Sequence, residues 1–128
     1  MIKLRKPAGM TLAEILIAVF VLSIGILSAL MFFTSAMIAT ETARDMTEAT
    51  THAEYTLEEM KTRSSLANIT GTNWVSWASG ASLNTLPSET VTVTFVNASA
   101  DPLDITVTVG WTKKGRSNNV ALRTEMHK

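Results

Sequence analysis

The sequence predicts an α+β protein in which a long N-terminal helix packs on a small antiparallel sheet of about three strands. Three observations support this fold class. Residues 15–40 carry no charged side chain. A stripe of small and apolar residues then continues at helical spacing as far as Met60. Finally, three runs of alternating apolar and polar residues lie between residues 91 and 126, and such alternation is typical of strands with one buried face.

The uncharged segment predicts a membrane-spanning helix. It is longer than the roughly 20 residues that a helix needs to cross a bilayer. Three basic residues precede it, Lys3, Arg5 and Lys6, and acidic Glu41 and Asp45 follow it. The positive-inside rule therefore predicts that residues 1–9 lie in the cytoplasm and that the C-terminal part lies outside.

A cleaved secretory signal peptide is the alternative for this segment. Such a peptide has an apolar core of about 7–15 residues, followed by a cleavage site of small residues. The run here is too long, and Thr34-Ser35-Ala36 fits that cleavage pattern poorly. The length favours a segment that stays in the chain.

The helical pattern continues beyond the membrane-spanning segment. Neither proline nor glycine interrupts residues 26–66, so we expect one continuous helix from about Thr11 to about Arg63. The second half, residues 41–63, is amphipathic, because its other faces are charged. Its stripe has alternating spacings of four and three residues: Ala39, Ala43, Met46, Thr50, Ala53, Leu57 and Met60.

The remaining residues are expected to cover this stripe. Residues 64–90 are rich in Ser, Thr, Asn and Gly, with Trp74 and Trp77 among them, and are predicted to form a long connecting loop. Residues 91–126 then contain the three alternating runs, joined by short links. Consecutive strands with short links pair in antiparallel fashion, so we expect an antiparallel sheet whose apolar face packs on the helix.

Composition gives no support for catalysis. The chain of 128 residues has no cysteine, zero formal net charge and two histidines, His52 and His127. No arrangement of nucleophile, base and orienting group can be placed, and no cluster has metal-ligand spacing. We therefore expect neither an enzyme nor a metal, and no cofactor.

The order of these parts resembles the type IV pilin family, which includes the minor pilins and the pseudopilins of type II secretion. The resemblance rests on Gly9-Met10-Thr11-Leu12-Ala13-Glu14 and the apolar residues that follow, including Leu22-Ser23-Ile24-Gly25. The last segment is most similar to minor pilins of the pilus-modification "V" kind and to the minor pseudopilin "I". On this resemblance residues 1–9 are a prepilin leader, 10–40 the transmembrane and assembly helix, and 41–128 the globular head with the type IV pilin fold.

The resemblance implies a function and a set of site residues. A prepilin peptidase is expected to cut between Gly9 and Met10 and to N-methylate Met10, after Lys3, Arg5 and Lys6 have positioned the leader. Glu14, together with Thr11 and Leu12, is expected to guide assembly, because its carboxylate can pair with the Met10 amino group of a neighbouring subunit. An unpaired charge in an apolar bundle costs several kcal/mol, so this pair suits registry between subunits.

The same resemblance implies partners and a location. The partners would be the peptidase, other major and minor pilins or pseudopilins, and an assembly platform in the inner membrane. The protein would first be a single-pass inner-membrane protein with its head outside, and then part of a periplasmic or cell-surface filament. Three features favour a minor component: no proline lies near Met31, paired C-terminal cysteines are absent, and the globular part is short. Met10 departs from the pattern, because these branches mostly have phenylalanine there.

Two alternatives remain open. The first is a signal-anchored single-pass protein that presents a small outward-facing binding module and never assembles. The second concerns Lys113, Lys114 and Arg116, a basic hairpin tip that is a candidate contact for DNA or a partner. Three charges on a turn are usually just solvated, so nucleic acid is not the expected partner.

Overall fold

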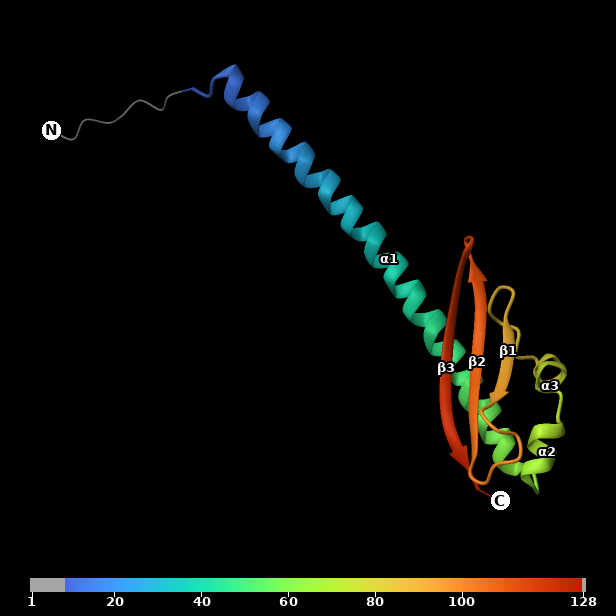
Figure 1. Cartoon of the computed structure of the whole chain (residues 1–128). Helices are drawn as coiled ribbons and strands as arrows, with labels where there is room; N and C mark the ends of the chain where they lie inside the picture. Colours follow the sequence, from blue (N-terminus) through green and yellow to red (C-terminus); the bar gives the residue numbers. More distant parts are fainter. Residues whose placement is uncertain (1–8, 128) are drawn as a thin grey trace. The chain divides into compact units, whose positions relative to one another are not determined.

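The computed structural model describes residues 9–127, and its elements follow the predicted order (Figure 1). Helix α1 extends over Leu12–Thr62, helices α2 and α3 over Leu66–Gly71 and Trp74–Gly80. The strands are β1 (Thr90–Phe95), β2 (Leu103–Lys113) and β3 (Arg116–Met126). The chain divides into two compact units between Thr40 and Glu41. The long helix on a three-stranded antiparallel sheet confirms the predicted α+β fold and is consistent with the type IV pilin fold expected from the resemblance.

The second part of α1 packs through a narrow row of small side chains. The buried residues of the helix are Asp45, Ala49, Ala53, Thr56 and Met60. The predicted stripe is therefore correct at Ala53 and Met60 but wrong near Met46, which is 45% exposed. Ala49 and Ala53 are 0% exposed, and their small size allows the helix backbone to approach the sheet closely.

The segment 64–90 differs from the predicted loop, because it contains the two short helices. Each begins at a polar capping residue. The Ser65 hydroxyl accepts a 3.2 Å hydrogen bond from the Asn68 backbone N–H, and the Asn73 side chain accepts one of 3.1 Å from Ser76. Such caps stabilise helix ends by about 1 kcal/mol. Ile69 and Trp74 then reach the core from these helices, at 0% and 4% exposure.

The sheet has the strand order β1-β2-β3, and all pairs are antiparallel. The β2–β3 turn consists of Lys114 and Gly115, at φ 51° and 76°. Positive φ at both central residues is typical of the tight turn that matches strand twist in a two-residue hairpin. The alternation expected for residues 91–126 is confirmed along β2, where every second residue from Leu103 to Trp111 is buried.

The apolar core lies wholly within the second unit, residues 41–128. It combines one face of α1, both short helices and the inner face of the sheet. Its largest fully buried apolar side chains are Met60, Ile69, Leu103, Ile105, Val107 and Val109.

Candidate functional site

The first turn of α1 places Glu14 beside Thr11. Glu14 Oε2 accepts a 2.8 Å hydrogen bond from the Thr11 backbone N–H and one of 3.1 Å from its hydroxyl. In return, the Glu14 backbone N–H donates to Thr11 Oγ1 at 3.3 Å. This reciprocal pattern is a capping box, in which a Thr at the N-cap and a Glu three residues later satisfy each other's backbone groups.

The expected cleavage residues lie just ahead of this cap. Gly9 and Met10 are exposed and precede the helix, which begins at Leu12. A side chain built on Gly9 would meet no atom within 4 Å. The leader charges Lys3, Arg5 and Lys6 lie outside the described residues, so the structure places only Gly9, Met10, Thr11, Leu12 and Glu14 of this site.

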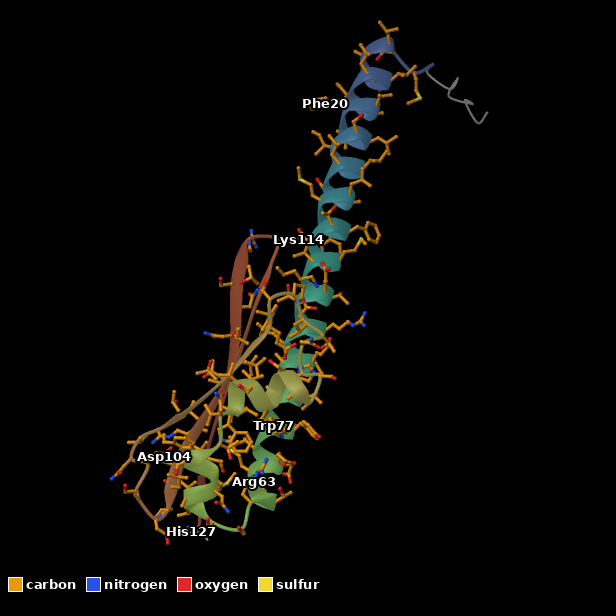
Figure 2. All side chains as sticks on the ribbon, turned by 90° about the vertical axis from the view of Figure 1, so that its right-hand side faces the viewer. Phe20, Arg63, Trp77, Asp104, Lys114 and His127 are labelled. Atoms are coloured by element: carbon orange, nitrogen blue, oxygen red, sulfur yellow. The ribbon has the colours of Figure 1, made fainter. Side chains whose placement is uncertain are left out.

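The apolar part of α1 is exposed along its whole length. Every residue from Leu12 to Thr40 is exposed, and Phe20 projects from this part of the helix (Figure 2) at 66% exposure. Its hydroxyls donate to backbone carbonyls four residues earlier, for instance Ser23 to Val19 at 2.7 Å and Ser28 to Ile24 at 2.8 Å. Bonded in this way, hydroxyls are tolerated in lipid. Among the described residues one helix is long and apolar enough to cross a membrane.

In the head, the basic hairpin tip faces acidic residues of α1. Lys113 Nζ lies 2.7 Å from Asp45 Oδ2 and 2.9 Å from Glu41 Oε1, and Lys114 Nζ lies 3.2 Å from Glu41 Oε2. Figure 2 shows Lys114 at the end of the β2–β3 hairpin. The hydrogen bond from Lys113, with a second from Lys114, lowers the pKa of Glu41. The hydrogen bond to Asp45, with a second to Glu41, raises the pKa of Lys113 against the opposing effect of desolvation.

Trp74 and Trp77 form an aromatic cluster with Tyr55 of α1 and with Arg63, the residue after the end of α1. Trp77 stacks on Tyr55 at a ring-centroid distance of 5.8 Å, and Trp74 meets Trp77 edge-on at 5.4 Å. The Arg63 guanidinium lies over the Trp74 ring at 5.5 Å, and the Trp74 indole N–H donates to the Ile69 carbonyl at 2.8 Å. This cluster fastens α2 and α3 to the helix, so the tryptophans chiefly cover the core.

Both histidines lie beside carboxylates. His52 Nδ1 lies 2.5 Å from Glu89 Oε1, and the Glu89 side chain is 0% exposed. His127 Nδ1 lies 3.5 Å from Asp101 Oδ1 at the surface. Within the described residues 9–127, no group of three or more His, Cys, Asp or Glu residues could hold a metal ion.

Comparison with known proteins bears on the N-terminal site. The family described as the prokaryotic N-terminal methylation motif matches residues 4–30. The chain carries a class III prepilin signal, the N-terminal signature of the type IV pilin family. No curated protein and no solved structure matches the chain.

The match at residues 4–30 supports a type IV pilin-like substrate of prepilin peptidase. Together with the apolar helix it indicates membrane anchoring. The motif also implies assembly with other pilins, which are typically structural proteins rather than enzymes. It ends at residue 30, so it does not describe the head of this pilin-like protein.

Sequence reasoning missed two features of this pilin-like chain. The capping box could have been found, because Thr11-Leu12-Ala13-Glu14 has the spacing that defines it. The contact between the hairpin tip and α1 could not, because Asp45 and Lys113 are 68 residues apart.

Proposed function

We propose that this chain is a minor pilin or pseudopilin, a structural subunit that joins, primes or caps a type IV pilus or a type II secretion pseudopilus. One observation carries the proposal. The methylation motif at residues 4–30 overlaps the first part of α1. The uncharged residues of this part are exposed on every side of the helix, and its first turn contains Glu14. Such a helix needs lipid or other apolar helices around it, and a filament bundle supplies the latter.

The first proposed step is cleavage between Gly9 and Met10 by prepilin peptidase, followed by N-methylation of Met10. The bond lies ahead of the helix, in exposed backbone, so a peptidase does not need to unwind α1 to reach it. Lys3, Arg5 and Lys6 would keep the leader on the cytoplasmic face, where the peptidase of this family acts.

The second proposed step is assembly, in which Glu14 sets the register. Its carboxylate uses Oε2 for the cap on Thr11, and a carboxylate offers about four acceptor positions. It can therefore also accept from the Met10 amino group of a neighbouring subunit. Leu12, which is 78% exposed, would pack against neighbouring helices beside this pair.

The proposed location follows from these steps. The precursor is a single-pass protein of the inner membrane with residues 41–128 outside, and the mature subunit enters a periplasmic or cell-surface filament. Its partners are the peptidase, other pilins or pseudopilins and the inner-membrane assembly platform. Nucleic acid is not proposed, because Lys113 and Lys114 are already paired with acidic residues of α1.

The decisive experiment is the intact mass and N-terminal peptide of the chain, taken from native membranes with and without the peptidase. We expect a chain that begins at methylated Met10 only when the peptidase is present. Gly9→Val should keep the leader attached, whereas Gly25→Ala should be processed normally, because a side chain at Gly25 meets no atom within 4 Å. A chain that still begins at Met1, or one cut near Ala36, would exclude the filament subunit.

A second candidate is a signal-anchored protein that never assembles. It is favoured by one observation, namely that the head contains the complete core and could act alone as an outward-facing binding module. The two candidates predict different amounts of the chain in the filament fraction. A processed subunit should appear in sheared filaments, whereas an anchored module should stay with the membrane.

A further inference from the structure

Two triplets of the head have the spacing Asn-x-Ser/Thr, namely Asn68-Ile69-Thr70 and Asn97-Ala98-Ser99. In exported proteins such a triplet, without proline in the middle, is an acceptor for an N-linked sugar when it lies in a surface loop. The sequence does not distinguish between the two triplets, because both have the required spacing. The structure does distinguish them, because a transferase must reach the asparagine nitrogen and bind all three residues.

The first triplet is part of the folded helix α2. The side-chain nitrogen Nδ2 of Asn68 donates a 2.8 Å hydrogen bond to Ser64 Oγ, and the Thr70 hydroxyl donates to the Ala67 carbonyl at 3.3 Å. Ile69, between them, is 0% exposed and belongs to the core. A transferase could bind this triplet only if α2 left the core, so Asn68 is a poor acceptor in the folded head.

The second triplet lies in the link between β1 and β2 (Figure 1). Asn97, Ala98 and Ser99 are all exposed. The Ala100 N–H donates to the Asn97 carbonyl at 3.1 Å, which closes a tight turn, and the Ser99 N–H donates to Asn97 Oδ1 at 3.0 Å. The second bond forms an Asx turn, in which an asparagine side chain bonds to the backbone two residues later.

The Asx turn occupies the oxygen of the Asn97 carboxamide and leaves its nitrogen available. In the part of the chain that the structure describes, neither Asn97 Nδ2 nor the Ser99 hydroxyl has a hydrogen-bond partner. N-glycosylation depends on these two groups, because the nitrogen becomes bonded to the sugar and the hydroxyl defines the third position of the triplet. Both groups are presented at the surface, and neither has to be withdrawn from the core.

A sugar at this turn would also cover apolar side chains next to it. Val96, which precedes Asn97, is 74% exposed, and Phe95 is only partly buried against the core. A sugar ring has a face of C–H groups, which can pack on such side chains and remove apolar surface from water. The link is therefore suited to carry a sugar as well as to accept one.

We propose that Asn97 is a site of N-linked glycosylation and that Asn68 is not. The donor is a lipid-linked sugar diphosphate, used by a transferase on the outer side of the membrane. Asn97 Nδ2 forms a bond to the anomeric carbon of the sugar, while the bond from that carbon to the diphosphate oxygen breaks. The lipid diphosphate leaves with the electron pair, and the proton lost from Nδ2 passes to a base of the transferase.

This inference rests on one part of the proposed function, namely the orientation that puts residues 41–128 outside. It does not depend on assembly, because the positive-inside rule gives a signal-anchored protein the same orientation.

The first test is the mass of the full chain purified from native membranes, together with the mass of its peptide that contains Asn97. We expect the wild-type peptide to carry one or more sugar residues. Asn97→Gln should lose the added mass completely, whereas Asn68→Gln is the matched control and should keep it. An unmodified wild-type chain, or sugar attached at Asn68, would overturn the inference.

A second pair of variants separates recognition of the triplet from the shape of the turn. The Asx turn uses the backbone N–H of Ser99, so Ser99→Ala keeps the turn and removes only the hydroxyl. We expect Ser99→Ala to lose the sugar and Ser99→Thr, which restores the hydroxyl, to keep it. Because these side chains are exposed, circular dichroism of the full chain in detergent should match wild type in every variant. Sugar that persists in Asn97→Gln or Ser99→Ala would show that Asn97 is not the acceptor.

N-terminal analysis of the same samples keeps the two hypotheses apart. A chain that begins at Met10 but carries no sugar would overturn the glycosylation and leave the proposed function intact. A chain that keeps its leader in the presence of the peptidase but carries sugar at Asn97 would overturn the filament subunit and leave the glycosylation intact.

Discussion

Thr11 and Glu14 satisfy each other's backbone groups at the first turn of α1, with the carboxylate 2.8 Å from the Thr11 N–H. Glu14 is therefore already a capping residue in a single chain. A carboxylate near a helix N-terminus is also stabilising because it interacts favourably with the helix dipole. The proposed role in assembly must be separated experimentally from this local role.

The two roles of Glu14 predict different phenotypes. Glu14→Gln keeps a capping-box side chain but removes the charge, so we expect normal cleavage and a severe loss from the filament fraction. Thr11→Ala keeps the charge and weakens the cap by about 1 kcal/mol, so filament levels should change little. The measurement is the ratio of subunit in sheared filaments to subunit in membranes. Equal losses in both variants would show that capping alone accounts for Glu14.

The contact of Lys113 with Asp45 and Glu41 should stabilise the head. Lys113→Met removes both pairs and leaves Asp45, which is 7% exposed, without its cation. We expect a clearly lower melting temperature of the full chain in detergent. Lys114→Met is the matched control, because Lys114 is 73% exposed in its side chain and, within residues 9–127, pairs with Glu41 alone. It should change the free energy of unfolding by less than about 0.5 kcal/mol, as most surface substitutions do. A larger effect from Lys114→Met than from Lys113→Met would contradict this assignment.

The same contact predicts the pH range over which Lys113 and Glu41 stabilise the head. The pKa of Glu41 is lowered from its ordinary 4.5, so its contribution to stability is complete above pH 4.5 and is lost as the pH falls through the lower folded-state value. The pKa of Lys113 is raised from 10.5, so its contribution is complete below pH 10.5 and is lost as the pH rises beyond it. The difference in melting temperature between wild type and Lys113→Met should be largest inside this range and should shrink on both sides. A difference that stays constant down to pH 3 would argue against the ionic contact.

His52 should stabilise the head by satisfying the buried Glu89. Besides His52, the Glu89 carboxylate accepts a 2.9 Å hydrogen bond from the Leu86 N–H. Removing the imidazole with His52→Ala leaves a buried polar group without this partner, which costs about 1–3 kcal/mol. Replacing both groups in His52→Leu/Glu89→Met should recover part of the loss, because it removes the buried carboxylate but leaves the Leu86 N–H without its acceptor. Chemical denaturation of the three proteins checks this, and a double variant less stable than His52→Ala would refute it.

Trp74 should be the most sensitive residue of the short helices. It is 4% exposed, and its indole fastens α3 to the Ile69 carbonyl of α2. Trp74→Ala should lower the free energy of unfolding by about 3–5 kcal/mol. The adjacent Val75 is 56% exposed, so Val75→Ala should change stability by less than about 0.5 kcal/mol. Similar losses in the two variants would show that α3 does not pack as described.

Structural features that depend on neighbouring residues were predicted correctly from the sequence. Features that depend on contacts between residues far apart in the chain were not. The single helix ending near residues 12 and 62 follows from the run without proline or glycine and from the helical stripe, and the strands follow from alternation. The buried stripe near Met46 was misplaced because Lys113, far along the chain, draws Asp45 toward the sheet. The helices at Leu66 and Trp74 were missed because short polar segments have weak helical propensity. Packing of Ile69 and Trp74 on the core, together with the caps at Ser65 and Asn73, stabilises them.

At the candidate site, the sequence alone identified the motif that the family comparison matches, because its residues are contiguous. The partners of the hairpin tip depend on the folded head and could not be read from spacing.

All buried core residues lie at or beyond Ala49, while residues 12–40 are exposed throughout. The two parts of the chain are therefore energetically separable. The surroundings of residues 12–40 can change from lipid to neighbouring helices without removing a single contact from the head. Under the proposed function, the helix would therefore pass from lipid to a filament while the core of the head stays folded.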